Sequence, residues 1–463
     1  MNSLQTAVCE IVGNCDFSVN SYLSTTNSSY FPQIKLIFVE FNPLVSMEER
    51  TILVWFRNDL RIHDNEILLR AIERSHQIVP VYCFDPRHFA KTKYGTRKTG
   101  VLRAAFLREN VLALRQTLQQ LGGDLIVNYG HPEELLPQIA EKYQVDEVYH
   151  HREVAYEETY ISGLVEEALW KMQINLRHFI GHTLYHKEDL PFPIRDIPNA
   201  FSVFKKKTER ESSIRPQLDT PKALRIPEGM DAGKVPGLAE LGFGSEEIVQ
   251  ASNLEFRGGE AVALKQMQAF LRDQSSTLED YSQLSPYIAV GALSPNTLYH
   301  ATKEAENTTL DKKRGEQIIL KLLWRDYYRF MFKKHGNRFF RLTGLTGTPP
   351  EIAANDDKRF DLWKCANTGN PIVDRSIQQL NDTGYLPYYQ RVIVAWYLIY
   401  ELKVNWLKGA AWFEEKLIDY GPANNYGNWA HLAGVGSSLK DNKPVDIKKL
   451  TAQFYPKEVM EFE

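Results

Sequence analysis

Several kinds of segment and site are missing from this chain of 463 residues. Its four cysteines have neither C-x-x-C nor Cys/His spacing, which argues against a disulfide framework and against a zinc site. The longest apolar run, 392–400, is far too short to span a membrane. No G-x-G-x-x-G follows the first predicted strand, so a dinucleotide-binding fingerprint is missing. We therefore expect a chain without membrane segments that works in a reducing compartment.

The first residues lack the marks of a targeting segment. Residues 1–46 contain no Arg and no Lys before Lys35, and Glu10 and Asp16 interrupt their apolar positions. A signal peptide begins with basic residues before an apolar run, and a transit peptide is rich in Arg. We therefore expect a cytoplasmic protein. We interpret 1–48 as a disordered extension or a misread start, with one strand-like stretch at 34–41.

Net charge gives no global argument for a nucleic-acid partner, because 55 Lys and Arg face 58 Asp and Glu. Basic runs at 205–207, 312–314 and 333–334 are either local binding surfaces or solvated helix faces, and the sequence leaves both readings open. The 43% hydrophobic content is enough for the cores of two or three domains.

From residue 51, short β-branched runs alternate with amphipathic stretches. This pattern predicts strands at 51–56, 78–84, 124–128, 147–150 and 175–179, with helices between them that include 102–121, 132–143 and 157–172. Alternating strands and helices build right-handed βαβ units around a parallel sheet. We therefore predict an α/β, Rossmann-like domain over 49–180.

The remainder of the chain has a different pattern. Periodicity weakens and Pro becomes frequent over 181–257, which we interpret as an interdomain connector. From 258 to 463 strand signals disappear, and helices are expected at 372–380, 391–402 and 410–417 within an all-α domain. The stretch 317–331 is apolar almost all round, which is typical of a helix buried at the centre of such a domain. Its Lys321, Arg325 and Tyr328 share one face by spacing.

The stretch 417–430, LIDYGPANNYGNWA, has an unusual composition. It is dense in Gly, Asn and Pro, and it carries one carboxylate, two adjacent amides and a Trp. We interpret it as a loop that would pack poorly in a core but would form a good wall for a flat, hydrogen-bonding ligand.

Together with WRDYY at 324–328, Arg391 and Trp406, this stretch resembles the flavin pocket of the photolyase/cryptochrome family. WFRNDLRIHDN at 55–65, VPVYCFDP at 79–86 and LSPYIAVGALSP at 284–295 resemble further motifs of that family. The connector residues DLPFPI at 189–194, Phe201 and IRP at 214–216 look most like the cryptochrome DASH branch. The resemblance covers about 50–455. It implies FAD in the helical domain and, in the DASH branch, 5,10-methenyltetrahydrofolate as an antenna.

The resemblance also implies roles for single residues. Arg391 and Asp419 match the ion pair beside the isoalloxazine ring, and Asn425 matches the residue that faces flavin N5. Trp429 and Trp406 match the proximal and middle members of the tryptophan chain that photoreduces the flavin. The stretch 349–357, where the distal member would lie, contains no Trp, and the open substitutes are Tyr327, Tyr328, Tyr385 and Trp363.

The other FAD contacts that the resemblance implies are Ser282, Leu284, Ser285, Trp324, Arg325 and Tyr328. Glu157 lies where DASH members contact the antenna. Taken alone, these residue types have simpler roles: Ser282 and Ser285 as helix caps, Asn425 as a turn residue and Glu157 as an acid at a helix N-terminus.

The departures from the family pattern fall mainly on the pocket for damaged DNA. Lys321 stands where photolyases carry a Glu, Tyr388 and Tyr389 replace an Asn–Arg pair, and His431 replaces a base-stacking aromatic, whereas Trp324 keeps its stacking role. Exchange of a carboxylate for an ammonium inverts both charge and hydrogen-bond direction. Gly421 in place of an Asp, and a shortened segment before Ser282, also predict weaker FAD binding.

Three functions stay open at this point. The first is an FAD-binding, blue/UV-A light-responsive cryptochrome of DASH type that retains some affinity for single-stranded or damaged DNA. The second is a deoxyribodipyrimidine photolyase, in which reduced FAD donates an electron that splits a cyclobutane pyrimidine dimer. The third is a cofactor-free paralogue that serves as a binding protein. We expect a monomer in each case.

Overall fold

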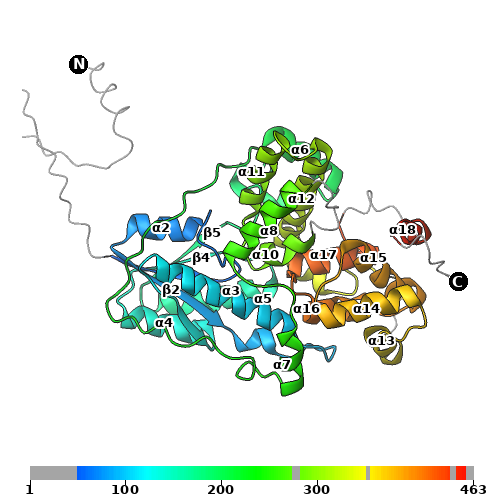
Figure 1. The fold of residues 1–463 in the computed structure, drawn as a ribbon, viewed down its shortest axis with the longest axis horizontal. Helices are drawn as coiled ribbons and strands as arrows, with labels where there is room; N and C mark the ends of the chain where they lie inside the picture. Colours follow the sequence, from blue (N-terminus) through cyan, green and yellow to red (C-terminus); the bar gives the residue numbers. More distant parts are fainter. Residues whose placement is uncertain (1–49, 274–281, 351–354, 438–444, 455–463) are drawn as a thin grey trace, which may run out of the picture. The chain divides into compact units, whose positions relative to one another are not determined.

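The computed structural model describes residues 50–273, 282–350, 355–437 and 445–454 (Figure 1). By internal contacts, the chain from Met47 onward forms one compact unit. The strand-like stretch 34–41 lies outside the described residues.

The first half of this unit is built on a five-stranded sheet. Its strands are β1 (Thr51–Phe56), β2 (Gln77–Phe84), β3 (Ile126–Tyr129), β4 (Glu147–His151) and β5 (Asn175–Phe179). They run in the order β3-β2-β1-β4-β5, and every neighbouring pair is parallel. In the central register, Leu53 lies opposite Val79 and Val148. The predicted parallel sheet is confirmed.

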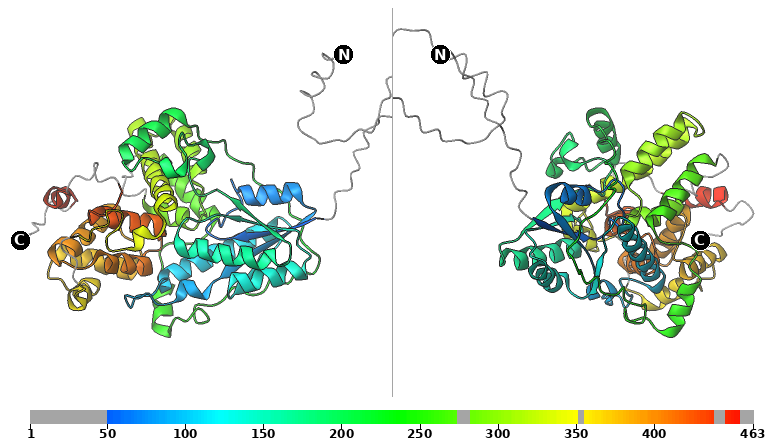
Figure 2. Two further views of the ribbon diagram at one scale, coloured as in Figure 1. Left: turned by 180° about the vertical axis from the view of Figure 1, so that it is seen from behind. Right: turned by 60° about the vertical axis from the view of Figure 1, so that its left-hand side comes forward.

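Helices cover both faces of the sheet (Figures 1 and 2). Ile52, Val54 and Phe56 of β1 pack with α2 (Glu66–Arg74) and α3 (Val101–Gln120). Leu53 and Trp55 point the other way and pack with α4 (Pro132–Lys142) and α5 (Tyr156–Trp170). Because side chains alternate along a strand and both faces are covered, the central strands β1 and β2 are apolar almost throughout.

The connector contains more structure than the sequence predicts. It forms the short 3-10 turns η2 (Lys187–Asp189) and η3 (Ile194–Asp196) and the helices α6 (Phe201–Glu211) and α7 (Ser245–Ser252). A similar turn, η1 (Pro86–Phe89), follows β2 in the sheet domain. In α6 the side chains of Phe201, Phe204 and Thr208 are buried. Their spacing marks one helix face, which the high Lys content of 205–207 obscures in the sequence.

The second half is helical, as predicted, and α13 to α17 gather on one side of the sheet and its helices (Figures 1 and 2). The elements are α8 (Glu260–Arg272), η4 (Ser282–Leu284), α10 (Ser285–Ala289), α11 (Pro295–Glu306), α12 (Lys312–His335), η5 (Gly336–Phe340), α13 (Asp357–Lys364), α14 (Pro371–Thr383), α15 (Tyr388–Trp396), η6 (Tyr397–Glu401), α16 (Trp406–Lys416), α17 (Pro422–Leu432) and α18 (Ile447–Phe454). The predicted helix at 391–402 is α15 followed by the π-helical turn η6. No helix within the described ranges is both long and apolar enough to cross a membrane.

The interpretation of 417–430 as a loop was wrong beyond residue 421, because α17 begins at Pro422. Proline suits the first helical turn, where its missing N–H needs no partner. Gly427 allows a close approach to α12, since a Cβ there would lie 2.4 Å from Cδ1 of Tyr328. Burial of Tyr426, Trp429 and Ala430 therefore outweighs the poor helix propensity of Asn and Gly.

The long helix α12 holds the connector in place through buried polar side chains. Asp326 accepts hydrogen bonds from the backbone N–H groups of Leu184 and Tyr185, at 3.1 and 2.9 Å. Tyr327 donates to the carbonyl of Asn199 at 2.5 Å. The central position predicted for this helix is confirmed, and part of its polar face serves the connector.

Burial raises the pKa of Asp326 from its ordinary 3.8 to about 7, against the opposing hydrogen bond from Tyr185. Between these two values the folded state holds a proton that the unfolded chain releases, so the free energy of unfolding falls as pH rises. Asp326→Asn removes this titration together with one acceptor oxygen. We expect it to cost about 1–3 kcal/mol at pH 5 and less at pH 8, measured by urea denaturation.

Asp311→Asn is the matched control, because Asp311 also accepts two backbone N–H groups of α12 but lies exposed at its start. Its cost should be the same at pH 5 and pH 8. A cost of Asp326→Asn that does not change between pH 5 and pH 8 would contradict the assignment.

Candidate functional site

A buried ion pair lies between α15 and the turn before α17. Arg391 Nη2 is 2.8 Å from Asp419 Oδ2, and the two side chains are 21% and 4% exposed. Ser285, at the start of α10, donates its hydroxyl to the same oxygen at 2.5 Å, and Arg391 Nε donates to the carbonyl of Leu386 at 2.6 Å. A buried charge without its partner is strongly destabilising, so Arg391 and Asp419 depend on one another.

Three buried oxygens beside this pair have no hydrogen-bond partner within the described residues: Asp419 Oδ1, Asn424 Oδ1 and Asn425 Oδ1. Asp419, Asn424 and Asn425 line one small hollow, together with Arg391 and Trp429. Buried polar atoms in native proteins are nearly always hydrogen-bonded, so three unsatisfied acceptors around one hollow point to a ligand that donates hydrogen bonds.

Asn425 has a fixed orientation in this arrangement. Its Nδ2 donates to the backbone carbonyl of Ala410 at 2.9 Å, so its Oδ1 is the atom left for a ligand. A side-chain amide can both donate and accept hydrogen bonds, so the sequence alone does not fix which role Asn425 has. The structure makes it an acceptor, which suits a ring nitrogen that carries a proton.

The hollow is small in this conformation, at about 80 Å³. Sites for small molecules typically measure roughly 300–1,000 Å³, so a flavin ring requires the surrounding side chains to separate. Tyr388, which is 55% exposed at the start of α15, is the most exposed of the lining residues, so the least packing opposes its displacement.

Trp429 and Trp406 are both buried, at 2% and 1% exposure. Trp429 lies against Gly409, where an added Cβ would be 2.3 Å from Trp429 Cη2, so α16 and α17 are in close contact at this point. Trp429 also packs edge-to-face against Trp363, with ring centroids 6.4 Å apart. Trp363 is one of the open substitutes for the distal member, and residues 351–354, within the stretch that lacks a Trp, lie outside the described residues.

The other residues that the resemblance places around FAD have the following contacts. Trp324 stacks on Phe201 with ring centroids 3.5 Å apart, and Tyr328 donates to Asn428 Oδ1 at 3.3 Å. Arg325 donates to the carbonyls of His182 and Ile288. The side chain of Leu284 is fully buried, and that of Ser282 lies outside the described part of the chain, as do residues 274–281 before it.

Two contacts link four of the residues expected in the lesion pocket. Lys321 Nζ lies 5.9 Å from the ring centre of Tyr388, and the rings of Trp324 and His431 are 6.4 Å apart. Tyr389 is partly buried against the core. Since Phe201 covers one face of Trp324, at most its other face can stack on a base.

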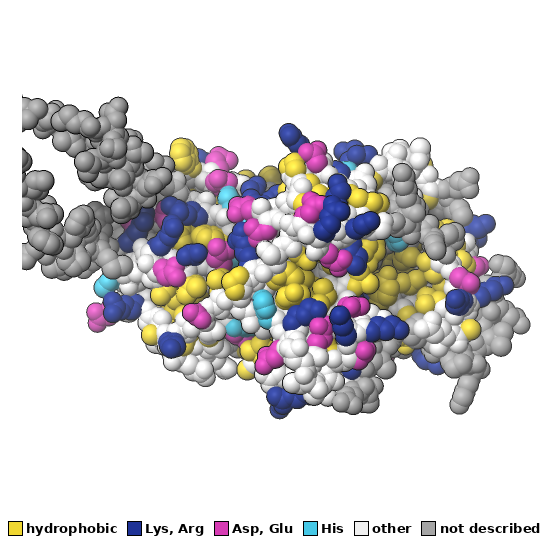
Figure 3. Space-filling model, turned by 90° about the horizontal axis from the view of Figure 1, so that it is seen from above, with side chains coloured by type: hydrophobic (Ala, Val, Ile, Leu, Met, Phe, Trp, Pro, Cys, Tyr) yellow, Lys and Arg dark blue, Asp and Glu magenta, His cyan; other side chains and the backbone are white. Residues whose placement is uncertain are grey.

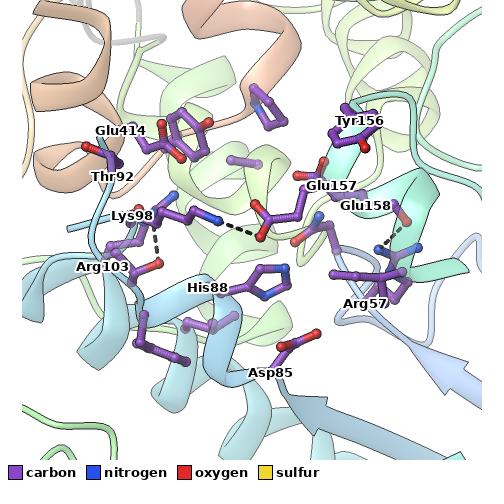
Figure 4. Close-up of a pocket in the computed structure, with 18 of the residues that line it drawn as sticks. Arg57, Asp85, His88, Thr92, Lys98, Arg103, Tyr156, Glu157, Glu158 and Glu414 are labelled. Atoms are coloured by element: carbon purple, nitrogen blue, oxygen red, sulfur yellow. Dashed lines mark hydrogen bonds and ion pairs between the residues drawn. The ribbon is translucent and has the colours of Figure 1, made fainter. Parts of the chain in front are cut away.

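A much larger cavity, of about 750 Å³, lies at the carboxyl ends of β1 and β2 (Figure 4). The starts of α3 and α5 border it, and α16 and α17 contribute Glu414 and Tyr426. In open parallel sheets, ligands bind at the carboxyl ends of the strands, at the point where the strand order reverses. Here the order reverses at β1, because β2 and β3 lie on one side of it and β4 and β5 on the other. Its polar lining residues include Arg57, Asp85, His88, Thr92, Lys98, Arg103, Tyr156, Glu157, Glu158 and Glu414.

Of this set, sequence reasoning singled out Glu157 as an antenna contact, and Arg57 and Asp85 only as parts of family motifs. Glu157 pairs with Lys98 at 2.5 Å, and the pair reaches across the cavity (Figure 4). Burial, and then the nearby charge of Glu153, raise the pKa of Glu158 to about 7. Burial also raises the pKa of Glu414, which accepts a hydrogen bond from the hydroxyl of Tyr426 at 2.8 Å. The cavity thus offers a carboxylate paired with a lysine, at Glu157, and carboxyl groups whose pKa burial raises, at Glu158 and Glu414, which suits a ring with mixed donors and acceptors.

Charged side chains of both signs border a band of apolar side chains on the face seen in Figure 3. Several residues of the basic runs are engaged within the fold. Lys205 pairs with Glu209 at 2.5 Å, Arg314 donates to the carbonyl of Asp273, and Lys334 donates to the carbonyl of Ile197. These contacts favour the reading of the runs as helix faces over that of dedicated binding surfaces.

Comparison with known proteins agrees with this architecture. Residues 52–223 match the DNA photolyase family, and residues 318–453 match the FAD binding domain of DNA photolyase. A protein named cryptochrome DASH from Gloeobacter violaceus is 38% identical, over 89% of this chain and 84% of its own length. Another from Synechocystis sp. is 38% identical, over 88% and 85%. One from Solanum lycopersicum, named as chloroplastic/mitochondrial, is 36% identical, over 87% and 75%.

Solved structures give the same result. The crystal structure of the Synechocystis cryptochrome superposes with a TM-score of 0.81 at 37% identity, covering 88% of this chain and 87% of that one. A class III photolyase from Agrobacterium tumefaciens shares the fold, with a TM-score of 0.74 at 24% identity over 90% and 86% of the two chains. The chain therefore belongs to the photolyase/cryptochrome family, in its cryptochrome DASH branch.

Proposed function

We propose that this protein is a blue/UV-A light-responsive cryptochrome of DASH type that binds FAD between α10, α15 and α17. The observation that carries the proposal is the set of three unsatisfied buried oxygens on Asp419, Asn424 and Asn425 beside the Arg391–Asp419 pair. A cofactor-free binding protein would have no need for acceptors held in this way.

FAD, when bound, supplies blue-light absorption and one-electron chemistry. The chain's own residues bind and orient it. Asp419 Oδ1 and Asn425 Oδ1 would accept hydrogen bonds from protonated ring nitrogens, and Arg391 holds the Asp419 carboxylate in place. With FAD in this hollow, Trp429, which lines it, would be the immediate electron donor, and Trp406 on the neighbouring helix would be the next.

DNA is a partner that the family supports, but dimer repair is not the activity that this pocket favours. Lys321 lies against Tyr388 in place of a carboxylate, and His431 lies beside Trp324 in place of a larger stacking ring. An ammonium cannot accept the hydrogen bond that a carboxylate accepts. We propose affinity for single-stranded or damaged DNA without efficient repair.

The larger cavity supports an antenna site. Its volume of about 750 Å³ lies within the range of small-molecule sites, and its lining combines the Glu157 carboxylate with aromatic walls from Phe89, Tyr94 and Tyr156. We propose that 5,10-methenyltetrahydrofolate binds there, with Glu157 accepting hydrogen bonds from the pterin ring. A cytoplasmic, monomeric protein remains the expectation from the sequence.

Asp419→Asn should weaken FAD binding by at least about tenfold, because it leaves the Arg391 guanidinium unpaired and removes a charged acceptor. Quenching of flavin fluorescence on titration of FAD with apoprotein measures the effect. Asp382→Asn makes the same chemical change at an exposed position of α14, where the carboxylate contacts Gln378, and should leave binding unchanged. Equal affinities of the wild type and a folded Asp419→Asn protein would refute the site.

Illuminated wild-type protein reconstituted with FAD should not remove cyclobutane dimers from either single-stranded or duplex oligonucleotides. Lys321→Glu combined with Tyr388→Asn and Tyr389→Arg restores the acceptor and the amide–guanidinium pair, and we expect light-dependent repair to appear. Chromatographic counting of the dimers left after illumination follows both proteins. Efficient repair by the wild type would make the photolyase reading correct.

Glu157→Gln should lower the affinity for 5,10-methenyltetrahydrofolate by about tenfold or more, because a charged acceptor for the ring is replaced by a neutral amide. The absorbance of the bound pigment after gel filtration measures this loss. Glu134→Gln, on the exposed side of α4, is the control and should retain the pigment. Full pigment retention by Glu157→Gln would show that the ring binds elsewhere.

A further inference from the structure

An open hollow of about 770 Å³ reaches the surroundings of Trp406. Its lining includes Asn405 and Leu407, the chain neighbours of Trp406, and Leu342, whose carbonyl accepts a hydrogen bond from Trp406 Nε1 at 3.2 Å. Trp406 itself is 1% exposed. A molecule in the hollow therefore comes close to the edge of the indole that carries its N–H, with Leu342 between them.

Trp406 needs a source of electrons in the proposed function. Once it has given an electron to Trp429, it is a radical cation whose N–H points at a backbone carbonyl. A carbonyl accepts a hydrogen bond but is too weak a base to remove the proton. The stretch 349–357 offers no Trp to replace the electron. None of the substitutes that the sequence left open lines the hollow within the described chain: Tyr327, Tyr328, Tyr385 and Trp363. A molecule in the hollow can supply the electron instead.

The hollow carries a surplus of positive charge. Its charged lining residues are Lys93, Arg341, Lys408 and Asp357. Lys408 and Asp357 neutralise one another, because Nζ of the lysine is 2.5 Å from Oδ1 of the carboxylate. Lys93 and Arg341 are exposed, and neither has an ion pair with a carboxylate in the part of the chain that the structure describes. Two cations without acidic partners raise the local concentration of an anion.

The hollow also contains amide groups. Asn405 Nδ2 donates to Asn355 Oδ1 at 3.1 Å, and Asn405 Oδ1 accepts a hydrogen bond from the N–H of Leu407 at 2.9 Å. This arrangement leaves the Nδ2 group of the exposed Asn355 able to donate. Two cations and an amide donor suit a small anion that has several oxygen acceptors.

We propose that this hollow is the docking site of a small anionic one-electron reductant of the enediolate class, which returns an electron to oxidised Trp406. The inference rests on the proposed photoreduction and deepens it, because it names the source of the electrons. Trp429 gives one electron to the photoexcited cofactor, and Trp406 gives one electron to Trp429. The enediolate gives one electron to Trp406 and departs as its one-electron oxidation product. The N–H protons of both indoles stay in place.

The test uses ascorbate, which is an enediolate anion at neutral pH, and hydroquinone, which is a neutral reductant. A laser flash oxidises Trp406 in FAD-loaded protein at low ionic strength, and the decay of the tryptophan radical absorbance is followed against reductant concentration. With ascorbate the decay rate should saturate, because docking precedes electron transfer, whereas random collision gives a rate that rises linearly. Ligand-observed NMR of ascorbate with apoprotein in the dark should give a matching dissociation constant.

Lys93→Gln combined with Arg341→Gln should raise the dissociation constant of ascorbate about 2- to 10-fold, as expected for the loss of two exposed ion pairs. The rate preference for ascorbate over hydroquinone should fall by the same factor. Asp357→Asn should lower the dissociation constant by about twofold, because it leaves Lys408 without its carboxylate. Lys222→Gln removes a charge at an exposed lysine outside the hollow and is the matched control, with the dissociation constant of the wild type.

A linear dependence on ascorbate without binding by NMR, or equal dissociation constants in the wild type and the double variant, would overturn the docking site while leaving the proposed function standing. Loss of the ascorbate-dependent decay in Tyr94→Phe, with ascorbate binding unchanged, would overturn direct transfer to Trp406, because the Tyr94 ring that lines the hollow would then be the donor. A flash that produces no tryptophan radical in FAD-loaded wild type would contradict the proposed function itself, and with it the role of the docked reductant.

Discussion

The structure around the candidate flavin site depends on the cost of burying polar atoms without partners. The carboxylate of Asp419 is 4% exposed and has one oxygen paired with Arg391 and Ser285 and one oxygen unsatisfied within the described chain. This pair joins α10, α15 and the start of α17. Because a folded protein rarely tolerates such atoms, these helices form a site that is complete only with a hydrogen-bond donor in it.

The two sites use different parts of the same architecture. The parallel sheet opens a cavity at its carboxyl edge, and α16 and α17 close that cavity from the helical side. The same two helices carry Trp406 and Trp429. Tyr420 lines both the large cavity and the small hollow beside Asp419. One side chain therefore borders both the proposed antenna site and the proposed flavin site.

Much of the fold could be predicted because its signals are local. Strands β1 and β5 match their predicted ranges. In β1 a buried run with Thr, Ile and Val gives the signal. The helix α17 was missed because Asn and Gly predict turns, whereas packing of Gly427 against Tyr328 of α12 and of Trp429 against Gly409 of α16 decides its conformation. The acidic and basic lining of the large cavity could be recognised only in part, since it combines residues more than 300 positions apart, from Arg57 to Glu414. Such pairings have no periodic signal in the sequence.

The most direct measurement is the visible absorption spectrum of protein purified in the dark, recorded again after blue light with a reductant present. The account predicts oxidised-flavin bands that bleach on illumination, and slower bleaching in Trp429→Phe, because that residue lines the flavin hollow as its proposed electron donor. A featureless visible spectrum that added FAD does not restore would contradict the account and leave a protein with the fold but without the cofactor.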